Sequence, residues 1–138
     1  MFKRYVLIAA LLIVAQVYAR GAGRTIVIPV DSRTNPTDAR QMYTSYCAPC
    51  HGADGRGHGL IAGSLKTPPP DLTMLARAHG GKYPDSHVVT VLSFGTETNT
   101  AVMPAWGPVF ARLESVQADE STLRINNLTR YLKTIQVK

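Results

Sequence analysis

The sequence feature that most constrains this chain is the motif Cys47-Ala48-Pro49-Cys50-His51, which contains its only two cysteines. The two thiols are three residues apart, and the imidazole follows the second directly. Residues three and four apart share one face of a helix, so a helical motif presents two sulfurs and one ring on the same side. The motif is therefore suited to holding one common ligand.

Other uses of such a cysteine pair fit this sequence less well. A thioredoxin-like redox pair belongs in a βαβ unit, and the sequence shows no such unit. A zinc site needs further soft ligands, and a disulfide between residues three apart on a helix has poor geometry. Covalent haem remains, because Cys-x-x-Cys-His is the signature of c-type attachment, in which each thiol adds across one haem vinyl group.

At this motif the sequence resembles the monohaem c-type cytochromes, the class I cytochrome c-like proteins of the small, exported bacterial type. Two further segments carry the resemblance: Thr67–Thr73, with its Pro-Pro-x-Asp-Leu-Thr pattern, and the pair Met103-Pro104. The match extends over roughly residues 36–136. It implies an all-α, cytochrome c-like fold of several short helices wrapped around one covalently bound haem c.

The resemblance also implies the site residues. Cys47 and Cys50 hold the haem covalently in such a protein. His51 is then the proximal iron ligand and Met103 the distal one, a soft thioether that favours Fe(II) and raises the reduction potential. Four other side chains remain alternatives for the distal position: Met74, His58, His79 and His87.

Four glycines within Gly52–Leu60 predict a tight loop with positive φ angles or close backbone approach. Relatives commonly end this loop with Gly-x-Gly-Pro, whose proline carbonyl accepts a hydrogen bond from the haem histidine. Leu60 stands in that place here, so the sequence leaves open which carbonyl bonds to the His51 ring.

Hydrophobic spacing predicts a first helix that starts near Asn35 as its cap and a last helix that follows Asp119. The last helix is expected to cross the first near Tyr43. Between them, a short helix is expected after Asp71 or Thr73, and it should end at Gly80-Gly81. Another is expected from Pro84 to Gly95, with these residues inside: Val88, Val89, Val91, Leu92 and Phe94.

The N-terminus is expected to target the chain rather than to fold with it. Lys3 and Arg4 precede an apolar run, and Val17-Tyr18-Ala19 suits cleavage by a signal peptidase. We therefore expect a signal peptide over residues 1–19, an irregular lead-in over 20–34 and a cytochrome c domain over 35–138. An uncleaved N-terminal anchor is the alternative, which the length of the apolar run disfavours.

The net charge of +6 fits either attraction to acidic redox proteins or simple solubility. No basic run with interleaved aromatic residues is present, which argues against nucleic acid as a partner. The sequence shows no arranged acid, base or nucleophile. We therefore expect an electron carrier of a periplasmic or respiratory chain rather than an enzyme. The alternatives are a haem subunit of a membrane respiratory complex and a haem enzyme or sensor with a labile distal ligand.

Overall fold

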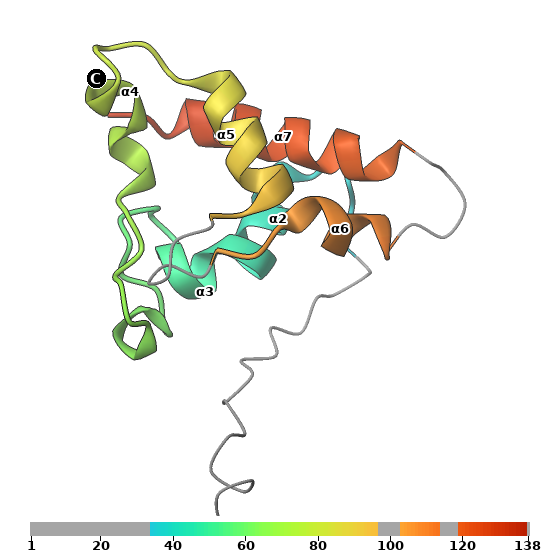
Figure 1. Cartoon of the computed structure of the whole chain (residues 1–138), viewed down its shortest axis with the longest axis horizontal. Helices are drawn as coiled ribbons and strands as arrows, with labels where there is room; N and C mark the ends of the chain where they lie inside the picture. Colours follow the sequence, from blue (N-terminus) through green and yellow to red (C-terminus); the bar gives the residue numbers. More distant parts are fainter. Residues whose placement is uncertain (1–33, 97–102, 114–118, 138) are drawn as a thin grey trace, which may run out of the picture.

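The computed structural model describes residues 34–96, 103–113 and 119–137 (Figure 1). The expected signal peptide and nearly all of the expected lead-in lie outside these ranges. Within them every regular element is helical and no strand occurs, which confirms the all-α prediction. The α-helical elements are α2 (Ala39–Met42), α3 (Ala48–His51), α4 (Leu75–Ala78), α5 (Asp85–Phe94), α6 (Trp106–Ala111) and α7 (Glu120–Thr134). Three other helical turns accompany them: a π-helix at Tyr43–Cys47 and 3₁₀-helices at Ala62–Ser64 and Leu72–Met74.

The first helical run, residues 39–51, differs from its prediction in its N-terminal cap and in containing a π-helix. Asp38, not Asn35, caps it, because the Asp38 carboxylate accepts a hydrogen bond from the Gln41 N–H at 2.9 Å. The π-helix then joins α2 to α3, and the Ala48 N–H reaches back five residues to the Tyr43 carbonyl. Pro49 follows at once and has no N–H to donate, so an ordinary helical bond pattern is interrupted here.

The predicted start and end of the helical segment that contains α4 agree with the structure. The Asp71 carboxylate accepts from the Thr73 N–H at 2.8 Å, as the capping prediction requires. Gly80 and Gly81 have φ angles of 65° and 85° directly after α4, where a left-handed conformation ends a helix. At the last helix, Asp119 occupies the N-cap position but its side chain makes no capping bond.

Two features of α5 and α6 were not predicted correctly. Val88 and Leu92 are buried, but Phe94 is 74% exposed rather than inside. Val88 and Leu92 lie four residues apart on one face, and Phe94 lies two residues further, on the other side of the helix. The short helix α6 has only Trp106 and Phe110 as a four-residue repeat, which is too little to reveal it in the sequence.

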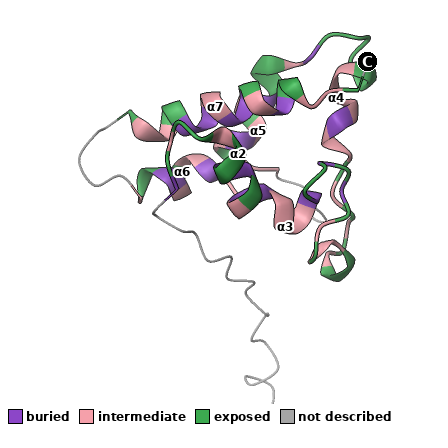
Figure 2. Ribbon diagram, turned by 180° about the vertical axis from the view of Figure 1, so that it is seen from behind, coloured by how far each residue is buried: buried purple, intermediate pink, exposed green. Residues whose placement is uncertain are grey.

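The core forms where the first helical run, α5, α6 and α7 meet, and Figure 2 shows that these helices contain buried segments. Tyr46, Trp106 and Phe110 make a ring cluster with centroid separations of 5.4 to 5.5 Å. The rings of Tyr43 and Tyr131 pack with centroids 5.2 Å apart and planes tilted by 44°, which confirms that the last helix crosses the first near Tyr43. Aromatic pairs at these distances add to the stability that their burial supplies.

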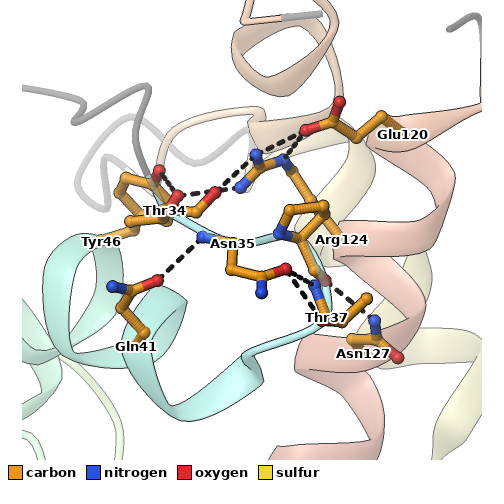
Figure 3. A network of polar contacts seen from close by, with 9 residues as sticks. Thr34, Asn35, Thr37, Gln41, Tyr46, Glu120, Arg124 and Asn127 are labelled. Carbon is orange, nitrogen blue, oxygen red and sulfur yellow. Dashed lines mark hydrogen bonds and ion pairs between the residues drawn. The ribbon is translucent and has the colours of Figure 1, made fainter.

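A buried polar network, not predicted from sequence, joins Thr34 to the first helical run and to α7 (Figure 3). The Arg124 guanidinium, 2% exposed, donates to the Thr34 hydroxyl and to the Thr34 carbonyl, each at 2.9 Å. It also forms an ion pair with Glu120 one turn earlier on α7. Thr34 in turn shares a hydrogen bond with the Tyr46 hydroxyl. We call Thr34, Tyr46, Glu120 and Arg124 the arginine network. It ties the start of the described chain to both the first and the last helix.

Replacing Arg124 tests the energetic importance of this network. Arg124→Ala is expected to lower the free energy of unfolding by about 2–4 kcal/mol, because it removes several buried, charge-assisted hydrogen bonds at once. Chemical denaturation followed by circular dichroism measures the change. The matched control is Arg130→Ala on the same helix. The exposed Arg130 side chain donates to Asn127, and its loss should leave the free energy of unfolding within about 0.5 kcal/mol of the parent. Equal stability of the two variants would contradict the structural role of Arg124.

Candidate cofactor site

An apolar pocket lies between the first helical run, the proline-rich segment, α5 and α7. Its wall includes all four residues predicted for the site: Cys47, Cys50, His51 and Met103. The rest of the lining is largely aliphatic and proline, including Leu65, Pro69, Pro70, Leu72, Leu75, Val88, Val91, Leu92 and Leu132. The structure thus brings two thiols, an imidazole and a thioether to one apolar surface, although Met103 follows the motif residues by 52 to 56 positions.

The two cysteines are free thiols on the pocket wall. Burial, with the nearby Cys50, raises the pKa of Cys47 to about 12, and burial also raises the pKa of Cys50. A redox-active Cys-x-x-Cys pair has the opposite property, a lowered pKa that supplies thiolate at neutral pH. The site therefore does not match a thioredoxin-like centre.

The His51 ring is 7% exposed, and its orientation is set by a carbonyl that the sequence left unidentified. The Nδ1 atom lies 3.3 Å from the Pro70 carbonyl oxygen, which can only accept, so Nδ1 is the donor. Burial lowers the pKa of His51, against a smaller opposing effect of this hydrogen bond. A neutral ring that donates from Nδ1 keeps the lone pair of Nε2 for a metal.

Leu60 stands where relatives have the proline, and it is 96% exposed. Pro70 belongs to the proline-rich segment, 19 residues beyond His51. The proline-rich segment thus provides the acceptor in this chain. No local signal near the motif could have identified it, because the contact depends on how the loop folds back.

The glycine loop holds the motif through the backbone, as its composition predicted. The N–H groups of Gly57, Gly59 and Ile61 donate to the carbonyls of His51, Cys50 and Pro49, at 2.7, 3.0 and 3.0 Å. Gly52, Gly55 and Gly57 have positive φ angles. At Gly59, a Cβ atom would lie 2.3 Å from the Pro49 carbonyl oxygen, so only glycine fits this approach.

Met103 is half-buried and lines the same pocket as the cysteine motif. Its backbone passes so close to Gly95 that a Cβ there would lie 2.6 Å from the Met103 carbonyl oxygen. Of the alternative distal residues, only His87 also lines the pocket, at an exposed position of α5. Met74, His58 and His79 are not among the pocket-lining residues.

Comparison with known proteins adds a family match. A family model described as cytochrome C oxidase, cbb3-type, subunit III matches residues 34–119, well over half of the chain. The matched range contains the cysteine motif, the proline-rich segment and Met103. No curated protein and no solved structure matches. In the part of the chain that is described, no helix has the length and apolar character needed to cross a bilayer.

Substitution of Gly59 tests the close packing of the loop on the motif. Gly59→Ala is expected to destabilise the purified protein by about 1–3 kcal/mol, because the new methyl group meets backbone atoms that cannot rotate away. Thermal melting measures the loss. Gly63→Ala is the matched control, since a Cβ at Gly63 meets nothing within 4 Å and its φ angle is negative. A Gly59→Ala protein as stable as the Gly63→Ala protein would refute this packing.

Proposed function

We infer, because the chain belongs to the family of cytochrome c oxidase, cbb3-type, subunit III, that it is a c-type cytochrome whose haem transfers one electron at a time. Membership of this family implies a covalently bound haem c. The single Cys-x-x-Cys-His motif in the sequence supports one haem per chain.

We propose that Cys47 and Cys50 are the attachment residues and that His51 and Met103 are the axial ligands. One observation carries the proposal: all four side chains line the same apolar pocket. When bound there, the haem supplies the Fe(III)/Fe(II) couple. The protein supplies attachment, axial ligation and exclusion of water.

The residues around these ligands support the proposed roles of the protein in orienting the ligands and tuning the reduction potential. The Pro70 carbonyl holds the imidazole of His51 in one orientation and strengthens it as a donor to iron. The thioether of Met103 favours the reduced iron and therefore raises the reduction potential. The aliphatic lining from Val88, Val91 and Leu92 lowers the local polarity, which also tunes the potential.

The proposed setting is an exported protein that carries electrons between redox proteins of a respiratory chain. The signal-like N-terminus and the basic charge support this setting. A second setting has specific support, because the family description names a subunit of an oxidase complex. In that case the chain is a haem subunit held in a membrane complex, and its partners are the other subunits.

Visible spectra of the oxidised and reduced protein test the distal ligand. Met103→Ala is expected to lose the low-spin spectrum of the parent and to bind cyanide or carbon monoxide rapidly, because the sixth position becomes open. Met74→Ala and His87→Ala are the controls and should retain the parent spectrum. A parent that itself binds these ligands rapidly would favour a haem enzyme or sensor with a labile sixth position.

An unchanged spectrum in Met103→Ala would contradict the ligand assignment. Loss of the low-spin spectrum in His87→Ala alone would move the distal position to His87, the other candidate that lines the pocket. The same result in Met74→Ala would require the chain around Met74 to move to the iron.

Intact mass of the protein from cells that mature c-type haem tests attachment and processing together. We expect the denatured chain to retain the mass of one haem and to begin at Arg20. Cys47→Ala/Cys50→Ala should release all its haem on denaturation, whereas each single variant should retain one thioether. A denatured parent without haem would contradict attachment, and an unprocessed N-terminus in a purified multi-subunit complex would favour the membrane-bound setting.

A further inference from the structure

A second pocket, different in its chemistry from the first, is lined by residues of the loop that joins α4 to α5 and of the adjoining helix ends. Figure 1 shows the course of this loop. Its lining is polar and contains two imidazoles: His79, Lys82, Tyr83, Pro84, Asp85, Ser86 and His87. The ring centroids of His79 and His87 are 5.9 Å apart, and both side chains are exposed to solvent. Electron transfer as proposed above leaves this pair without a role.

We propose that His79 and His87 bind one divalent transition-metal ion of borderline softness, such as Zn²⁺, Ni²⁺ or Cu²⁺. Imidazole is a preferred ligand for these ions, whereas Ca²⁺ and Mg²⁺ require sets of oxygen ligands. Within the described residues no group of three His, Cys, Asp or Glu side chains is placed to hold a metal. The two imidazoles are therefore the ligands from the protein, and water completes the coordination.

The orientation of His79 supports a ligand role. Its Nδ1 atom lies 2.8 Å from the Leu75 carbonyl oxygen, which can only accept a hydrogen bond. The Nδ1 atom is therefore the donor, and the neutral ring keeps its Nε2 lone pair for a metal. A ring tied to a backbone carbonyl through its other nitrogen is the usual arrangement of a metal-ligating histidine.

The separation of the two rings is within reach of a shared ion. A Zn–N bond of about 2.1 Å and a nitrogen-to-centroid distance of about 1 Å place two ligating imidazoles with centroids about 5 Å apart at the tetrahedral angle, and about 6 Å apart when the two bonds are nearly in line. The observed separation of 5.9 Å is wider than the tetrahedral value by about 1 Å, so the rings must approach each other to share an ion. Because both side chains are exposed, small rotations can shorten it without disturbing the core.

The charged groups of the second pocket set its selectivity. The Asp85 carboxylate bonds to the Lys133 ammonium, at 2.9 and 3.0 Å, and Lys82 lines the same pocket. These two ammonium groups disfavour a hard cation that depends on charge attraction alone. Their repulsion matters less for a transition-metal ion, because that ion also gains directional bonds from two neutral imidazoles.

His87 lines both pockets, so an ion bound there lies beside the proposed haem site. Added positive charge at the rim of the pocket stabilises the reduced iron relative to the oxidised iron. Metal binding is therefore expected to raise the reduction potential. This consequence rests on the proposed function, whereas binding of the ion does not.

Isothermal titration of Zn²⁺ into the full, tag-free holoprotein tests the site. We expect one equivalent to bind, and both His79→Ala and His87→Ala to bind at least tenfold more weakly. The matched control is His58→Ala, an exposed histidine of the glycine loop that lines neither pocket and should leave the affinity unchanged. Thermal melting checks that each variant is folded.

Binding of Zn²⁺ that neither His79→Ala nor His87→Ala weakens would overturn the site, as would binding only at millimolar Zn²⁺. Coupling is measured as the reduction potential with and without saturating Zn²⁺. A rise in the parent that disappears in His79→Ala supports coupling, and an unchanged potential in the Zn²⁺-saturated parent overturns it. Because the haem spectrum of each variant is recorded first, failure of the metal site is distinguishable from failure of the proposed function.

Discussion

The structure depends on how the carbonyl groups at the end of the first helical run are satisfied. A helix leaves its last carbonyls without partners, and here three of them belong to Pro49, Cys50 and His51. The glycine loop turns back and donates its own N–H groups to all three. The loop then packs against the proline-rich segment, where a Cβ at Gly57 would lie 2.3 Å from the Pro69 carbonyl oxygen. That contact brings the next carbonyl, from Pro70, to the His51 ring.

Sequence reasoning succeeded where the signal is local. The cysteine motif, the glycine loop, the Asp71 cap and the Gly80-Gly81 stop each act within a few residues, so their chemistry can be read without knowing the fold. The family match supports the cofactor, and the four expected site residues share one pocket.

The features that sequence did not predict depend on contacts distant in the chain. Arg124 looks like a solvent-facing residue of an amphipathic helix, but it is buried because Thr34, 90 residues earlier, accepts its hydrogen bonds. The Pro70 carbonyl is likewise specified by tertiary packing. Phe94 was misplaced for a different reason, since counting apolar residues in α5 overlooked which of them share the face of Val88 and Leu92.

The arginine network also has a consequence for where this domain can be divided. The family match ends at residue 119, just before α7. A fragment excised at that boundary would lack the guanidinium that holds Thr34 and the aliphatic side chains of Ile125, Leu128 and Leu132, which are buried in the core. A unit that keeps this core intact must therefore extend from Thr34 through α7, and a piece that ends at residue 119 would expose apolar surface that favours aggregation.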